Sequence, residues 1–251
     1  MDALGATPHD DLPAQWPTGW HVAVVDETGS TNADLIASAL RGAPDRSVLA
    51  ARHQTAGRGR LDRRWDAPAG ANLLVSLLFT RVPPVPHVLT QRVAIAAAVA
   101  SERLAGVRPT LKWPNDLLLD GAKLAGVLAQ ATIVPAVAGT AATEPPRQVV
   151  VVGIGVNVGW APPDAARLGD SVRPMQLLAA LLHAYDELPD DIIDDYRARL
   201  GTLGRQVRVE LPDGSVVEGR ALDVDVDGRL VVLDECGITH RFQVGDIVHL
   251  R

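Results

Sequence analysis

The sequence predicts an α+β fold in two parts, a body of helices and strands over residues 21–200 and a small β module over residues 201–251. Two observations support this prediction. Before residue 200, segments with helical spacing of apolar residues lie between short apolar runs typical of buried strands. After residue 200, apolar and polar residues alternate and are separated by Asp-Gly turns, which is typical of short antiparallel strands.

The elements of the body follow from these patterns. Residues 1–20 form a predicted N-terminal arm with several prolines and acidic residues. Strands are predicted near 21–25, 47–54, 72–79, 109–113, 116–120, 124–133 and 149–158, and helices near 32–41, 87–106, 174–186 and 190–200. A turn is expected over 26–29, and Ser30 or Thr31 is expected to cap the first helix. Long loops are expected over 55–70 and 135–147.

The composition limits the function classes. The chain has 251 residues, of which 47% are hydrophobic and 22% charged, and such a chain buries a sizeable core. Its net charge of −6 argues against nucleic-acid binding over the whole surface. Cys236 is the single cysteine, so an intramolecular disulfide is excluded, and we predict no metal-ligating cluster. No signal peptide is evident, and no apolar run reaches the roughly 20 residues of a membrane span, so we expect a cytoplasmic protein.

Two segments match familiar binding motifs only in part. Residues 153–159 partly match a dinucleotide-binding fingerprint, but they lack its third glycine, and Pro162 follows where a helix should begin. Acidic residues over 223–234 match the spacing of a calcium-binding loop. The flanking residues alternate with period two, so we predict a β-hairpin that turns at Asp227 and Gly228.

A glycine- and arginine-rich loop is the clearest candidate for anion binding. Arg58, Arg60, Arg63 and Arg64 lie within seven residues of the sequence. Guanidinium groups bind phosphate and carboxylate in bidentate fashion, whereas four like charges repel one another. The loop is therefore expected to be mobile until an anion binds, and the alternative is a solvated basic loop.

Polar residues at the ends of predicted strands are further candidates. Residues 27–32 could either cap the helix or offer backbone N–H groups and hydroxyls to a ligand. Gln54 could bind a polar ligand or lie at the surface. Asn157 is predicted to lie inside a very apolar strand, where burying an amide without partners is costly, so it should contact a ligand or backbone. Lys112 and Lys123 are the only lysines in the chain, and this could reflect function or an arginine-biased composition.

Taken together, these stretches resemble the biotin–protein ligases, and the match implies a monofunctional type without an N-terminal DNA-binding domain. The resemblance rests on ETGSTNADL (27–35), HQTAGRGR (53–60), KWPNDLLL (112–119), KLAGVL (123–128) and GIGVN (153–157). The motifs stand in the family's order. The resemblance implies a mixed-sheet catalytic domain of the biotin/lipoate ligase type with a C-terminal SH3-like β-barrel.

The family's activity is then the expected function. Biotin would react with ATP to give biotinyl-5′-AMP, and a lysine of a biotin carboxyl carrier domain of a carboxylase would take the biotinyl group. The resemblance implies biotin, ATP and Mg²⁺ as small molecules, carrier domains as protein partners, and neither DNA nor membrane binding. A monomer or weak homodimer is expected.

The resemblance also implies roles for individual residues. Lys112 and Arg60 would be catalytic. The biotin-binding residues would be Ser30, Thr31, Asn32, Gln54, Arg58, Gly59, Arg60 and Lys112, and the ATP-binding residues Arg58, Arg60, Arg63, Trp65, Lys112 and Asn157. A compact ammonium at Lys112 can face two oxyanions at once, whereas the fork of an arginine is larger and fixed in direction.

The sequence departs from the family pattern at Asp62, where a glycine is usual, and the added negative charge puts the closing of the loop in doubt. Three other readings stay open. The chain could be a lipoate ligase or octanoyltransferase of the same fold, a biotin-binding module without turnover, or a nucleic-acid-binding protein built on the barrel. The motifs at 57–60 and 112–116 favour biotin, and the acidic run at 223–227 argues against nucleic acid.

Overall fold

The structure is a computed structural model that describes residues 12–60, 63–135 and 145–250. It contains a seven-stranded mixed sheet followed by a five-stranded antiparallel sheet. The larger sheet has the order β1-β2-β3-β7-β6-β5-β4, in which β1 and β2 are parallel and the other pairs antiparallel. The prediction of an α+β fold with a mixed-sheet body is confirmed.

The strands of the larger sheet are β1 (His21–Thr28), β2 (Ser47–Gln54), β3 (Leu73–Phe79), β4 (Thr110–Lys112), β5 (Asp116–Leu119), β6 (Ala122–Val134) and β7 (Arg147–Val156). The helices are α1 (Thr31–Leu40), α2 (His87–Ala105), α3 (Pro174–Glu187) and α4 (Ile193–Arg199). Each predicted element is present. Tertiary pairing moves some of the ends: β1 continues through the predicted turn because Glu27 and Thr28 pair with the end of β2.

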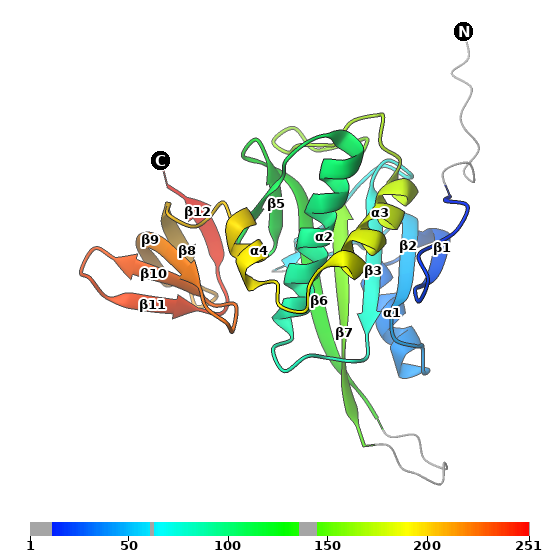
Figure 1. Cartoon of the computed structure of the whole chain (residues 1–251), viewed down its shortest axis with the longest axis horizontal. Coiled ribbons are helices and arrows are strands. Elements are labelled where there is room, and N and C mark those ends of the chain that lie inside the picture. Colours follow the sequence, from blue (N-terminus) through cyan, green and yellow to red (C-terminus); the bar gives the residue numbers. More distant parts are fainter. Residues whose placement is uncertain (1–11, 61–62, 136–144, 251) are drawn as a thin grey trace.

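Helices cover the two faces of the sheet in different numbers. Along β7, Val150 and Val152 pack into the large core that also contains apolar residues of α2 and α3. Val149 and Val151 point to the other face, where they pack with Leu35 and other apolar residues of α1. Figure 1 shows α2 and α3 together in front of the sheet. The face with α1 is only partly covered, which leaves room for a cavity.

The end of the predicted N-terminal arm is part of the core. Trp20 is buried and meets Phe79 and Tyr185 edge to face, with ring centroids 6.3 and 5.4 Å away. Its Nε1 donates a hydrogen bond of 3.0 Å to Asp186 Oδ2. The arm is therefore not loose at its C-terminal end, because burying an indole and satisfying its N–H group anchors the chain there.

The second sheet forms the C-terminal module, residues 201–250. Its strands are β8 (Gln206–Glu210), β9 (Val216–Val224), β10 (Leu230–Asp234), β11 (Thr239–Phe242) and β12 (Asp246–His249), in the order β11-β10-β9-β8-β12. The predicted hairpin is confirmed, because Gly228 has a φ of 73° in the turn between β9 and β10. A positive φ suits glycine, and the calcium-loop alternative is excluded because antiparallel strands, not helices, flank this turn.

The C-terminal module contacts the body at several points. Figure 1 shows it beside β5, on the side of the body away from β1. Arg197 of α4 donates two hydrogen bonds to the carboxylate of Asp223, at 2.7 and 2.9 Å. Trp113 Nε1 donates a bond of 3.0 Å to Gly228 O. These contacts hold the end of β9 and the β9–β10 turn against the body.

Candidate functional site

A cavity of about 590 Å³ opens between the body and the C-terminal module. Its walls come from the start of α1, the end of β2, the loop that follows β2, the turn between β4 and β5, the middle of β6 and β7, and the ends of β8 and β12. All the site residues that the sequence predicted line it: Ser30, Thr31, Asn32, Gln54, Arg58, Gly59, Arg60, Arg63, Trp65, Lys112 and Asn157. The fold thus brings distant motifs into one space.

The two lysines in the cavity have different surroundings. Lys123 Nζ forms an ion pair of 2.7 Å with Asp116 Oδ1. Lys112 lies half-buried opposite Asp116 in the β4–β5 pair, and within the parts of the chain that the structure describes its ammonium has no ion-pair or hydrogen-bond partner. Burial lowers the pKa of Lys112 from its usual range, and the charge of Asp116 partly opposes this shift. Lys112 is therefore the cation available for a ligand.

The arginine loop is docked on the C-terminal module. Arg60 donates hydrogen bonds to Asn115 Oδ1 at 2.9 Å and to Gly245 O at 3.1 Å. Asp246 accepts an ion pair from Arg60 at 3.5 Å and another from Arg63. These two arginines thus have protein partners without a bound anion, because the module supplies a carboxylate that the sequence pattern did not reveal.

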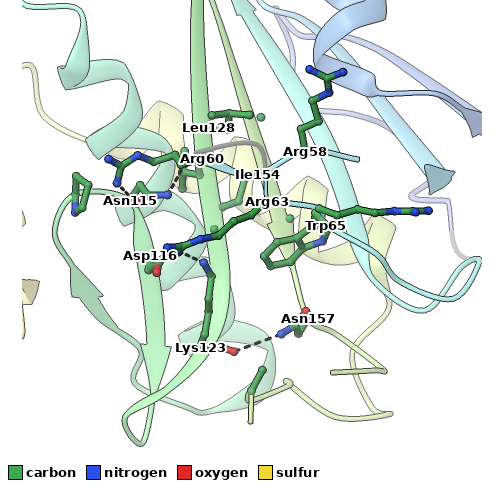
Figure 2. Close-up of a pocket in the computed structure, with 18 of the residues that line it drawn as sticks. Arg58, Arg60, Arg63, Trp65, Asn115, Asp116, Lys123, Leu128, Ile154 and Asn157 are labelled. Atoms are coloured by element: carbon green, nitrogen blue, oxygen red, sulfur yellow. Dashed lines mark hydrogen bonds and ion pairs between the residues drawn. The ribbon is translucent and has the colours of Figure 1, made fainter. Parts of the chain in front are cut away.

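Other parts of the loop differ from this docked pair. Arg58 is exposed, and in Figure 2 its side chain points away from Lys123 and Trp65. Asp62, whose charge put the closing of the loop in doubt, lies outside the described residues. Of the four arginines, Arg60 and Arg63 contact the module, Arg64 pairs with Asp66 within the loop, and Arg58 extends into solvent.

Trp65 lies on a floor made by two glycines. Gly126 of β6 and Gly155 of β7 are opposite each other in the sheet. A Cβ atom on Gly155 would lie 2.5 Å from the indole ring, closer than real Cβ contacts allow. Lys123 Nζ is 5.8 Å from the ring centroid, a cation–π distance. The glycines of the GIGVN segment therefore leave room for side chains that pack on the sheet. Their role differs from that of the glycines in a dinucleotide-binding motif.

The opposite end of the cavity holds a network of small polar groups. Gln54 Oε1 accepts hydrogen bonds from Thr31 N at 2.8 Å and Thr31 Oγ1 at 3.0 Å. Ser30 takes the N-cap position of α1 with extended backbone angles, as predicted, but its hydroxyl makes no capping hydrogen bond. The Ser30 hydroxyl is therefore not committed to the end of the helix.

Asn32 and Asn157 line the cavity, but their amides are used inside the protein. Asn32 Nδ2 donates to Gln130 Oε1 at 2.8 Å and to a backbone carbonyl of β6, while its Oδ1 accepts from Ser76 Oγ. Asn157 follows β7 rather than lying within it, and its Nδ2 donates to Lys123 O and to a second backbone carbonyl. Both asparagines therefore shape the walls, and the backbone contact expected for Asn157 is confirmed.

Among the lining residues that the sequence did not predict as part of the site, Asn115, Asp116 and Asp246 contact the cations of the cavity. Asn115 and Asp116 belong to the KWPND segment, so a signal was present, and Figure 2 shows them beside Arg60 and Lys123. Asp246 gave no local signal, since only the docking of the module brings it to the loop. In the described parts of the chain there is no group of three or more His, Cys, Asp and Glu side chains able to hold a metal ion.

Comparisons with known proteins agree with this geometry. Residues 23–143 match the model of the "Biotin/lipoate A/B protein ligase family", and residues 202–250 match the "Biotin protein ligase C terminal domain". The chain is 41% identical to the biotin--[acetyl-CoA-carboxylase] ligase of Mycobacterium tuberculosis, over 93% of this chain and 91% of that protein. It is 34% identical to the bifunctional ligase/repressor BirA of Bacillus subtilis, over 88% and 71% of the two chains.

A solved structure has the same fold. The biotin protein ligase from Aquifex aeolicus in complex with biotin and ATP superposes with a TM-score of 0.72 and 22% sequence identity, covering 92% of this chain and 99% of that one. The expected SH3-like module corresponds to the five-stranded antiparallel sheet and to the matched C-terminal domain.

Proposed function

The chain belongs to the biotin protein ligase family, and on that premise we propose that it attaches biotin to a lysine of biotin carboxyl carrier domains through biotinyl-5′-AMP. The observation that carries the proposal is the cavity in which the unpaired Lys112 shares the walls with Arg60 and Arg63. Such a site suits a reaction between two anions.

The chemistry has two steps. A carboxylate oxygen of biotin attacks the α-phosphorus of ATP, the bond to the β-phosphate oxygen breaks, and pyrophosphate leaves. The neutral amine of the acceptor lysine then attacks the carbonyl carbon of the mixed anhydride. An amide forms, AMP leaves, and the amine gives up a proton to solvent.

The first step needs a cation between its reactants. Two like unit charges 4 Å apart repel by roughly 4 kcal/mol at an effective dielectric constant near 20. We propose that the ammonium of Lys112 lies between biotin's carboxylate and the α-phosphate, where it lowers this repulsion and stabilises the charge of the transition state. Lys123 is less suited to this role because Asp116 already pairs with it.

Other residues receive roles by their place in the cavity. Arg60 is proposed to turn from Asp246 to the phosphates, with Arg58, Gly59 and Arg63 closing over the ligand. Biotin's polar ring atoms are proposed to meet Ser30, Thr31 and Gln54, with Asn32 as a wall, and adenine is proposed to pack near Trp65 and Asn157. Mg²⁺ would enter with ATP, held by the phosphates, since no acidic cluster is present in the described residues.

Partners and location are also proposals. Among the described residues no helix is long and apolar enough to span a bilayer. We infer a cytoplasmic protein that acts on carrier domains as a monomer or weak homodimer, and its net charge of −6 argues against DNA and anionic membranes as partners. We also propose residues 21–200 and 201–251 as the two domains.

One assay tests the function. The protein is incubated with ATP, Mg²⁺ and a purified carrier domain, and with biotin, lipoate or octanoate in separate reactions. We expect acyl transfer to the carrier only with biotin, detected by streptavidin and by the mass of the carrier. Transfer of lipoate or octanoate without transfer of biotin would contradict the proposal that biotin is the substrate. Binding of biotin without its transfer would indicate a binding module.

A further inference from the structure

The two peptide groups that flank Lys112 are held by the segment that joins the body to the C-terminal module. Gly201 N donates a hydrogen bond of 2.9 Å to Leu111 O, and Trp113 N donates one of 3.2 Å to Thr202 Oγ1. Strand β4 is only three residues long and pairs with β5 on one edge. The two hydrogen bonds fix its other edge, and with it the direction in which the Lys112 side chain leaves the backbone.

To accept the hydrogen bond from Trp113 N, the hydroxyl of Thr202 must direct its own proton away from that N–H group. Thr202 is fully buried, and its Oγ1 lies 3.2 Å from His249 Nε2 on β12. An oxygen that accepts the Trp113 N–H must send its own proton elsewhere. Within the described ranges of the chain, His249 Nε2 is the one acceptor in reach of that proton, so Thr202 donates to it.

This arrangement requires an uncharged imidazole. Burial lowers the pKa of His249 to about 4, and the nearby charges of Lys112 and Arg205 add to the shift. These two cations face His249 from β4 and from the segment before β8. A protonated ring could not accept the Thr202 proton, and it would place a second positive charge beside Lys112.

We propose that His249 is a positioning residue for the adenylation step, which fixes Lys112 by way of the Thr202 hydroxyl and the Trp113 N–H group. The inference rests on the proposed function. It gives the C-terminal module an indirect part in the chemistry, because His249 would act through Thr202 and Trp113 and not by touching the substrates. The path consists of two hydrogen bonds and the peptide group next to Lys112.

The test compares His249→Leu, which removes the acceptor, with His249→Gln, whose Oε1 can replace Nε2. Adenylation is measured as biotin-dependent exchange of pyrophosphate into ATP. We expect the Leu variant to lose on the order of tenfold in kcat, because small displacements of reacting groups are costly. The KM for ATP should change by less than kcat. The Gln variant should recover most of the rate.

His240 supplies a matched control in the same module. It lies on β11 and bonds Asp234 through Nε2 at 2.7 Å, without a link to β4. We expect His240→Leu and His240→Gln to leave kcat within about twofold of the unaltered protein, as surface substitutions remote from a site do. An equal loss at His240, an unchanged rate in His249→Leu, or no difference between Leu and Gln at position 249 would overturn the proposal.

A second measurement does not depend on activity. Long-range ¹H–¹⁵N spectra of the unaltered protein at pH 7 report which ring nitrogen of His249 carries the proton. We expect the proton on Nδ1 and an unprotonated Nε2; a proton on Nε2 or a charged ring would overturn the proposal. If the unaltered protein shows no biotin-dependent exchange, the proposed function fails, while the spectra still decide the hydrogen-bond arrangement.

Discussion

At the scale of single residues, the two lysines of this arginine-rich chain differ in what they contact. Lys123 is neutralised by Asp116, whereas Lys112 lies half-buried without a partner in the described structure. A partly desolvated ammonium next to a cavity has a strong field, because little water screens it. The sequence singled out both lysines, and the contacts separate their roles.

The first prediction concerns Lys112. Lys112→Ala should lower the rate of biotin-dependent pyrophosphate exchange by on the order of 100-fold or more, as the loss of a group that stabilises transition-state charge does. The melting temperature should change little, because the ammonium makes no hydrogen bond or ion pair with the described residues. Near-normal exchange by this variant would remove Lys112 from the mechanism.

At the scale of elements, glycines on β6 and β7 set the depth of the cavity. Gly153 and Gly155 point to the same face of β7, where Asn32 of α1 and Trp65 pack directly on the backbone. A side chain at either position would fill the space that these two groups use. The spacing of the glycines follows from the period of two along a strand.

The second prediction follows from this packing. A Cβ atom on Gly153 would lie 2.2 Å from Asn32 Oδ1, and Asn32 is held by several hydrogen bonds and cannot move freely. Gly153→Ala should lower the free energy of unfolding by about 1–3 kcal/mol, as overpacking does.

Gly29→Ala is the matched control, because nothing lies within 4 Å of its added Cβ. Its free energy of unfolding should change by no more than about 0.5 kcal/mol. Denaturant titrations of both variants measure the difference. Equal stabilities would show that Asn32 moves aside at little cost.

At the scale of the whole molecule, the C-terminal module completes the site. Asp246 binds two arginines of the loop, and the neighbouring strand residues line the cavity. If Arg60 and Arg63 bind the phosphates of ATP as proposed, those phosphates would replace the carboxylate of Asp246. We therefore propose that domain contact and ligand binding are coupled through the same guanidinium groups.

The third prediction tests this docking. Asp246→Ala should make the ligand-free loop more sensitive to trypsin, with cleavage after Arg60, Arg63 or Arg64 several times faster, because two ion pairs are lost. Glu218→Ala, which removes an exposed pair with Arg208 inside the module, is the control. Equal rates of cleavage in both variants would contradict the role of Asp246.

The fourth prediction concerns pH. The folded state holds the pKa of His249 at about 4, below its ordinary value of 6.5, so the unfolded chain binds a proton first as the pH falls. The contribution of neutral His249 to the free energy of unfolding is fully present above pH 6.5 and is lost as the pH falls toward 4. The melting temperature should therefore drop less between pH 7 and 5 in His249→Gln than in the unaltered protein. An equal drop would contradict the shift.

Much of the fold could be read from the sequence, with characteristic exceptions. Apolar runs and helical spacing located each element, because burial imposes its period locally. Ends were less certain: β1 runs to Thr28 because it pairs with Gln54 of β2, and pairing between distant segments leaves no local pattern. Trp20 was assigned to a loose arm for the same reason, since its aromatic partners are far along the chain.

The sequence by itself determined the chemistry available to this protein: a cluster of guanidinium groups, two lysines and small polar groups in a recognisable order. Residue type decides charge, donor geometry and size, and these need no folded chain. The tertiary structure alone decided which lysine is left unpaired among the described residues, which glycines form the floor, that Asp246 of the module reaches the site, and that His249 bonds Thr202 beside β4. Some of these contacts join residues far apart in the sequence, such as Arg63 and Asp246, and only the packing of the two sheets brings them together.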